Sequence, residues 1–217
     1  AGAAPGSYAG TTLSGAATER GAALLIGAPD DITIVPTPSP KAGPGAAYLL
    51  DDLSSTMGLS DAVAVVRGLQ DGARVGSSVA DGGDLDGDGL SDVLVGASGW
   101  SGQTDRGGAA GVFLAPVSGE LAFEDADLLL YGEQSVQQAG SGLASTDLNG
   151  DGYMDLAVGS DADEMSFVGR VYVFYGPLNE GGSSSLETAD AILSGESDGD
   201  VTGSTVIGSL DTDGDGR

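Results

Sequence analysis

The sequence predicts an all-β fold made of repeated, four-stranded antiparallel sheets. An acidic segment begins at Asp84, Asp147 and Asp211, which gives a repeat period of 63 to 64 residues. Each period contains four short apolar runs separated by turn-forming residues, and glycine is frequent, at 39 of 217 residues, without a collagen-like period. Four short strands per repeat are typical of one blade of a β-propeller. We therefore expect a single partial propeller of about three and a half blades over residues 1–217.

The first blade is expected over residues 8–68. Its link Ala17–Gly21 joins the first two strands without an acidic segment, so we expect no metal site there. The proline-rich residues 30–44 predict a long surface loop. The predicted strands are Gly10–Gly15, Ala22–Pro29, Ala46–Leu50 and Asp61–Arg67.

The second and third blades are expected over residues 74–132 and 138–195, and a fourth begins in residues 202–217. Their near-continuous apolar runs predict strands that are buried on both faces. The predicted strands of the second blade are Val75–Ala80, Asp92–Ala97, Ala110–Ala115 and Ala126–Tyr131. Those of the third are Ala139–Ser145, Asp155–Ser160, Gly169–Tyr175 and Ala189–Ser194, and the fourth contributes Thr202–Ile207.

The acidic segments have the spacing of a hard-cation site. Side chains at the first, third, fifth and ninth positions, and the backbone carbonyl at the seventh, can converge on one point if the chain curls tightly. Glycines at the fourth and sixth positions permit that curl because glycine tolerates positive φ. An all-oxygen shell favours Ca²⁺ over zinc or copper. The predicted ligands are Asp84, Asp86, Asp88, Leu90 and Asp92, then Asp147, Asn149, Asp151, Tyr153 and Asp155, then Asp211, Asp213, Asp215 and Arg217.

Two other interpretations of these segments are less favoured. An EF-hand requires a bidentate glutamate at the twelfth position, where this chain has Val95 or Val158 inside an apolar run. That run predicts a strand after the segment, whereas an EF-hand continues into a helix. A single segment of this kind could also be a solvated acidic turn. Three copies in register argue against that interpretation.

Short glycine-containing motifs recur on either side of the acidic segments. One set is Val75-Gly76, Ala139-Gly140 and Thr202-Gly203, and the other is Gly27-Ala28-Pro29, Gly96-Ala97-Ser98 and Gly159-Ser160. With the acidic segment between them, these motifs resemble the FG-GAP repeat of integrin α-subunit propellers and their bacterial relatives, without the aromatic residue of the FG position. The resemblance covers nearly the whole chain. It implies a propeller of about seven blades with calcium loops on its lower rim.

The composition narrows the classes of function. The net charge is −26 and Lys41 is the single lysine, which disfavours nucleic acid and anionic membranes as partners. Histidine and cysteine are absent, so the chain cannot form a Ser-His-Asp triad or a disulfide. No apolar run approaches the ~18 residues of a membrane span. Calcium loops of the extracellular type need roughly millimolar calcium, which predicts a secreted or cell-surface protein, and the resemblance suggests a bacterial one.

The sequence stops after the seventh position of the third acidic segment. A natural terminus there would leave an incomplete site and an open sheet edge, so we expect this chain to be part of a longer protein. A less favoured alternative is that a neighbouring copy supplies the missing parts, by self-assembly through open blade edges.

The function expected from these observations is that of an extracellular, calcium-binding propeller module for adhesion, protein–protein binding or surface assembly. Its partner would be a protein or a glycan. The alternative is the propeller domain of a secreted polysaccharide-active enzyme, a lyase or hydrolase, because this architecture hosts both classes. No catalytic constellation is visible in the chain, so we expect it not to be an enzyme.

Overall fold

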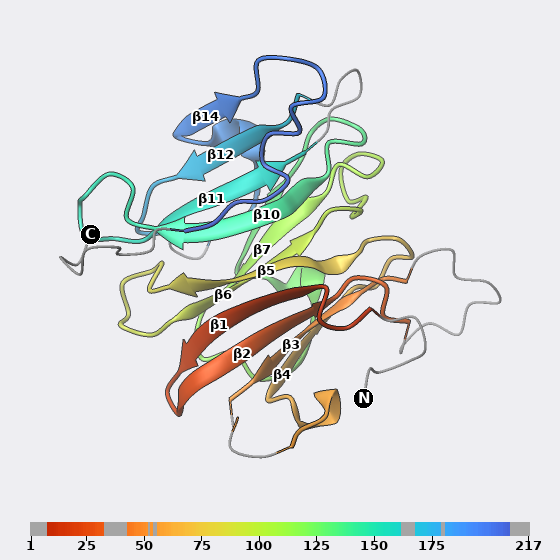
Figure 1. Ribbon diagram of the computed structural model, residues 1–217. Helices are drawn as coiled ribbons and strands as arrows, with labels where there is room; N and C mark the ends of the chain where they lie inside the picture. Colours follow the sequence, from red (N-terminus) through yellow and green to blue (C-terminus); the bar gives the residue numbers. More distant parts are fainter. Residues whose placement is uncertain are drawn as a thin grey trace.

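A computed structural model of the chain describes residues 8–32, 43–51, 53, 56–161, 168–178 and 181–208. Its strands form three mainly antiparallel sheets that follow one another in chain order. In Figure 1 the three sheets lie side by side, from the red first sheet to the blue third sheet. This arrangement confirms the all-β fold of propeller blades that the sequence predicts.

Each sheet contains the four antiparallel strands of one blade. The first blade has β1 (Thr12–Thr18), β2 (Gly21–Ala28), β3 (Ala46–Leu50) and β4 (Ala64–Arg67). The second has β5 (Val75–Gly83), β6 (Asp92–Ala97), β7 (Ala109–Phe113) and β9 (Leu128–Tyr131). The third has β10 (Ala139–Thr146), β11 (Asp155–Ser160), β12 (Arg170–Phe174) and β14 (Ala191–Ser194). The sequence therefore predicts these strands correctly except for a few residues at their ends.

A fifth strand at the outer edge of the first two sheets was not predicted. After β7, the chain reaches back to the first blade, where β8 (Gly119–Ala122) pairs in parallel with β4. After β12, β13 (Gly182–Ser185) pairs in parallel with β9 of the second blade. Both strands are short and lie at an exposed edge, so they lack the apolar alternation by which strands are predicted. They tie each blade to the preceding one.

Each of these strands leads into a short 3-10 turn. The turns are η2 (Phe123–Asp125) and η3 (Leu186–Thr188), and η1 (Leu59–Asp61) occupies the same place in the first blade. Phe123 and Leu186 are fully buried. The outer strand and the buried residue after it therefore form a second contact between neighbouring blades.

Neighbouring blades also approach each other along a row of paired glycines. A Cβ atom on Gly96 would overlap the carbonyl oxygen of Gly140 in the next blade, and Gly140 itself has φ +78°. Only glycine fits such a close backbone contact. The equivalent pairs are Gly27 with Gly76 and Gly159 with Gly203. The two recurring glycine motifs of the sequence are thus the two sides of one blade-to-blade contact.

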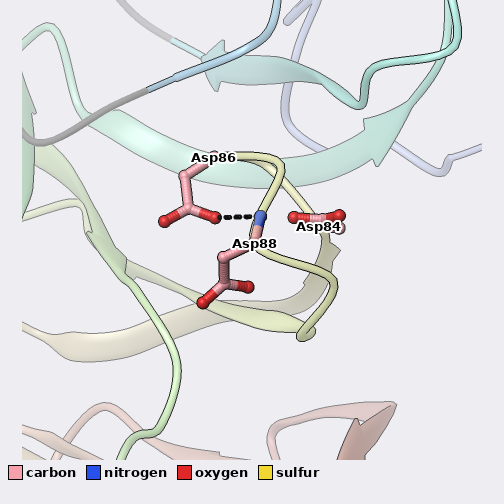
Figure 2. A group of neighbouring side chains, drawn as sticks. All are labelled: Asp84, Asp86 and Asp88. Carbon is pink, nitrogen blue, oxygen red and sulfur yellow. Dashed lines mark hydrogen bonds between the residues drawn. The ribbon is translucent and has the colours of Figure 1, made fainter.

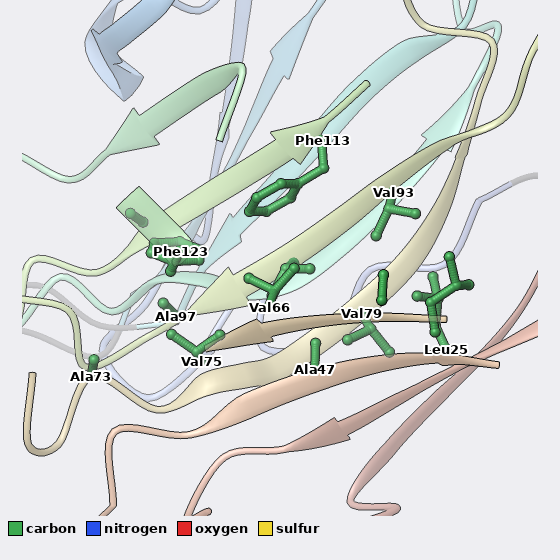
Figure 3. Packing of buried hydrophobic residues seen from close by; sticks show 14 of the residues in the cluster. Leu25, Ala47, Val66, Ala73, Val75, Val79, Val93, Ala97, Phe113 and Phe123 are labelled. Atoms are coloured by element: carbon green, nitrogen blue, oxygen red, sulfur yellow. The ribbon is translucent and has the colours of Figure 1, made fainter. Parts of the chain in front are cut away.

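The hydrophobic core lies mainly between the blades. One cluster joins the first and second blades, and Figure 3 shows Leu25 from β2 near Val79 and Val93 from the second sheet. A second cluster joins the second and third blades and includes Leu156 and the fully buried Tyr172. Burial between blades explains why their strands are apolar on both faces.

Trp100, the single tryptophan of the chain, belongs to the first of these clusters. Its side chain is 6% exposed, and its ring lies edge-on to Phe123 with 6.4 Å between centroids. Its Nε1 donates a 3.2 Å hydrogen bond to Glu124 in the turn after β8. Trp100 therefore helps to hold the second blade together.

The start of the fourth blade differs from the prediction. Thr202–Ile207 does not form a strand, because Thr202 makes only an isolated parallel bridge with Gly169. The antiparallel partner that β10 finds in β11 would follow residue 208, beyond the part of the chain that the structure describes. The third acidic segment, Asp211–Arg217, also lies outside the described residues. Within them, no helix is long and apolar enough to cross a membrane.

Candidate metal-binding loops

The first acidic loop joins β5 to β6 and is curled by its own carboxylates. Asp84 accepts hydrogen bonds from Gly87 N at 2.7 Å and from Gly89 N at 3.0 Å. Asp86 accepts from Asp88 N at 3.0 Å, and Asp88 accepts from Leu90 N at 2.7 Å. Gly87 and Gly89 have φ +86° and +89°, where a side chain would be strained. The glycines thus give the tight curl that the sequence predicts.

The second loop joins β10 to β11 and repeats the same bonds. Asp147 accepts from Gly150 N at 2.7 Å and from Gly152 N at 2.9 Å. Asn149 accepts from Asp151 N at 2.8 Å, and Asp151 accepts from Tyr153 N at 2.9 Å. Two loops 63 residues apart therefore adopt one geometry, although asparagine replaces aspartate at the third position.

The curl of the first loop brings three carboxylates together. Asp84, Asp86 and Asp88 each offer an oxygen, and these atoms lie within 4.8 Å of one another. Figure 2 shows the three side chains around the loop, with the bond from Asp88 N to Asp86 dashed. Three carboxylates at this separation repel one another, and a divalent cation among them would remove that repulsion. The oxygen donors fit a hard cation, so this group can hold a metal ion.

The second loop offers a matching donor set with one carboxylate fewer. The side-chain amide of Asn149 donates to Asp151 Oδ2 at 2.9 Å, while its carbonyl oxygen remains an acceptor. An amide oxygen is also an accepted calcium ligand. The lower negative charge predicts a weaker site in the second loop than in the first.

The aspartate at the ninth position of each loop is buried and makes hydrogen bonds of its own with the backbone. Asp92 is 1% exposed, and it accepts hydrogen bonds from Leu85 N and Ala115 N, both at 2.9 Å. Asp155 is fully buried and accepts from Leu148 N at 2.8 Å and Gly176 N at 2.9 Å. Each carboxylate thus ties the start of its loop to the second residue after the third strand.

Burial raises the pKa of Asp92 above its usual value, against the hydrogen bonds from Ala115 and Leu85, which lower it. The charges of Asp86 and Asp88 raise this pKa further. From the sequence, the ninth position was predicted only as a metal ligand. The hydrogen bonds by which it connects the loop to the segment after the third strand were not predicted. A signal existed in the recurring Ala115-Pro116 and Gly176-Pro177, which follow the third strand in both blades.

The remaining predicted ligands are either backbone carbonyls or residues outside the described part of the chain. Leu90 and Tyr153 occupy the seventh positions, where a carbonyl would be the ligand. Asp211, Asp213, Asp215 and Arg217 are beyond the described residues. The first blade has a tight turn in place of the loop, in which Arg20 N donates to Thr18 Oγ1 at 3.3 Å.

Comparisons with known proteins point to one family. Residues 139–174 match the model of the FG-GAP repeat. The chain is 34% identical over 169 residues to integrin alpha-3 of Mus musculus, an alignment that covers 76% of this chain and 15% of that protein. It is 34% identical over 155 residues to phosphatidylinositol-glycan-specific phospholipase D of Homo sapiens, covering 62% of this chain and 18% of the enzyme.

A shorter match, 39% identical over 94 residues, links the chain to integrin alpha-IIb of Mus musculus and covers 9% of that protein. The chain thus spans less than a fifth of the length of these relatives. The family-model match spans β10, the second acidic loop, β11 and β12 of the third blade. The chain is an FG-GAP repeat protein of the integrin α-like type.

Proposed function

We propose that the chain is an extracellular, calcium-stabilised propeller module that acts in adhesion, protein–protein binding or surface assembly. The observation that carries the proposal is the convergence of Asp84, Asp86 and Asp88, in a loop whose hydrogen bonds recur in the second loop. The proposed ligands are the side chains at positions one, three, five and nine and the carbonyl at position seven. Integrin alpha-3 is a relative, which supports an adhesive or binding role.

The protein's own groups prepare each loop for the cation. The glycine amides hold Asp84 and Asp147 at the start of the curl. Asp92 and Asp155 fix the loop to the blade and keep further lone pairs on their carboxylates. When bound, calcium would supply the positive charge that the clustered carboxylates lack. Each site would then stabilise the fold by about 1.4 kcal/mol at free calcium tenfold above Kd.

A calcium titration of the intact, calcium-stripped protein by isothermal calorimetry tests the proposal. We expect binding with Kd of about 0.1 to 1 mM, as in extracellular modules, and loss of one site in Asp86→Ala. The matched control is Glu19→Ala, at an exposed residue in the tight turn of the first blade. Unchanged binding in Asp86→Ala, or no calcium binding at all, would contradict the assignment.

A second candidate is the propeller domain of a secreted enzyme. The relative that favours it is phosphatidylinositol-glycan-specific phospholipase D, of which this chain matches 18%. The chain itself has no histidine and no cysteine. Hydrolytic or lyase activity of the intact protein that persists after the acidic loops are altered would support this candidate over an adhesive module.

A further inference from the structure

A pocket of about 400 Å³ lies between the first two blades, beside the tight turn where the first blade lacks a metal loop. Its floor is apolar and includes Leu49, Val63, Val93 and Val117. Its rim includes the turn residues Thr18 to Arg20 and the segment Gly89 to Ser91 of the first acidic loop. A pocket of this volume is within the range of ligand sites.

The repeat shows what fills the same place between the second and third blades. Leu49 lies four residues after Gly45, as Val112 lies four after Gly108, and the two glycines make equivalent bridges to the next blade. Val93 corresponds likewise to Leu156, since each lies three residues before a paired glycine. Val117 corresponds to Leu178, since each follows the proline after the third strand.

Between the second and third blades, this place is filled by Leu85 of the first acidic loop. Its side chain is fully buried in one cluster with Val112 and Leu156, against which Leu178 packs. Its carbonyl oxygen accepts a 2.6 Å hydrogen bond from Leu178 N. The loop thus supplies both a leucine side chain and a backbone acceptor to the next blade. The first blade has no loop and leaves both places open.

The equivalent donor in the pocket is the amide nitrogen of Val117. Among the residues that the structure describes, none accepts a hydrogen bond from Val117 N. Val117 lines the pocket and is half-buried. By analogy with Leu178 N, we infer that its N–H faces the place that the carbonyl of Leu85 occupies one blade further on. An unmet amide of this kind favours a ligand that carries a carbonyl oxygen.

Two charged residues of the pocket lining form an ion pair with each other. Arg20 pairs with Asp51 at 3.2 Å, with side-chain exposures of 76% and 8%. Both residues line the pocket, and the Arg20 side chain is largely exposed to solvent.

We propose that this pocket binds an extended peptide segment of a partner protein. One leucine-sized side chain of the peptide lies between Leu49, Val93 and Val117, and its carbonyl oxygen accepts from Val117 N. The peptide then makes the contacts that Leu85 makes one blade further on. The site borders the first acidic loop, whose residues Gly89 to Ser91 form part of its rim, but the contacts proposed for the peptide need no metal.

An NMR titration of the intact, ¹⁵N-labelled protein tests the proposal with neutral probes, which are not repelled by the net charge of −26. The probe is N-acetyl-leucine methylamide, and the matched control is N-acetyl-alanine methylamide. We expect saturable shifts centred on the Val117 amide and its neighbours in the pocket. We expect the alanine probe to bind about tenfold or more weakly, because it buries less apolar surface.

A pair of variants locates the site. Ala17 is exposed and lines the pocket, so Ala17→Phe is expected to block it and abolish the shifts. Its cross-strand neighbour Ala22 is also exposed but does not line the pocket, so Ala22→Phe should leave binding unchanged. Equal affinity for the two probes, or undiminished binding to a folded Ala17→Phe variant, would overturn the proposal.

Discussion

Asp92 accepts a 2.9 Å hydrogen bond from the amide nitrogen of Ala115, which lies two residues after the third strand of the second blade. Asp155 has the same relationship with Gly176 in the third blade. These two bonds connect each acidic loop to the segment that crosses to the preceding blade. The ninth position of the loop therefore has a structural role that does not depend on a cation.

Replacement of this aspartate should destabilise the protein with or without calcium. In Asp92→Ala the amides of Leu85 and Ala115 lose their acceptor. We expect the free energy of unfolding to fall by about 2 to 4 kcal/mol, since an unmet buried donor costs about 1 to 3 kcal/mol. Urea unfolding in a chelator measures the change. A variant as stable as the wild type under those conditions would show that the two hydrogen bonds to Asp92 contribute nothing to the free energy of unfolding.

Replacement of a carboxylate in the curl should behave in the opposite way. Asp86 and Asp151 accept only exposed bonds within their own loops. Thermal unfolding of Asp86→Ala or Asp151→Ala in a chelator should resemble the wild type. In excess calcium each variant should lose about 1.4 kcal/mol, the contribution of one site at tenfold saturation. Equal melting temperatures for the wild type in calcium and in a chelator would remove the basis of this prediction.

The strands and loops could be predicted from the sequence because each rests on a local signal. The run from Asp92 to Ala97 is apolar and bounded by turns, and the glycines at 87 and 89 mark a curl. The parallel strands β8 and β13 could not be predicted, because their pairing depends on a preceding blade far away in sequence. The structural role of Asp92 was hidden for the same reason, since Ala115 lies 23 residues further on.

The paired glycines offer a prediction with a close control. Gly140 and Gly150 have nearly equal φ values, +78° and +79°. A Cβ on Gly140 would overlap Ala109 O, whereas a Cβ on Gly150 would meet nothing within 4 Å. Gly150→Ala should lower the free energy of unfolding by about 1 to 2 kcal/mol, because alanine is strained in a left-handed backbone conformation. Gly140→Ala should cost about 2 to 5 kcal/mol, since overpacking adds about 1 to 3 kcal/mol to the same backbone strain.

Chemical denaturation of both glycine variants in a chelator separates the two costs, because Gly150 lies inside an acidic loop and a cation could mask its effect. A similar loss of stability in the two variants would mean that the blades can separate slightly to accept a methyl group. The close backbone contact would then not explain why glycine occurs on both sides of it.

Val136 is a β-branched residue with φ +58°, a backbone conformation that such side chains rarely adopt. The equivalent residues before the second and fourth blades are Gly72 and Gly199, with φ +78° and +90°. Val136→Gly should relieve about 1 to 2 kcal/mol of strain and add about 0.5 to 1 kcal/mol of chain entropy to the unfolded state. We expect a net gain in unfolding free energy of about 0.5 to 1 kcal/mol. The bond from residue 136 N to Asp105 O, 2.8 Å long, is kept because glycine retains the amide.

Val171→Gly, in the regular strand β12, is the matched control and should lose stability, since the same side chain there occupies unstrained backbone. If both variants are destabilised equally, the left-handed turn before the third blade holds no strain to relieve.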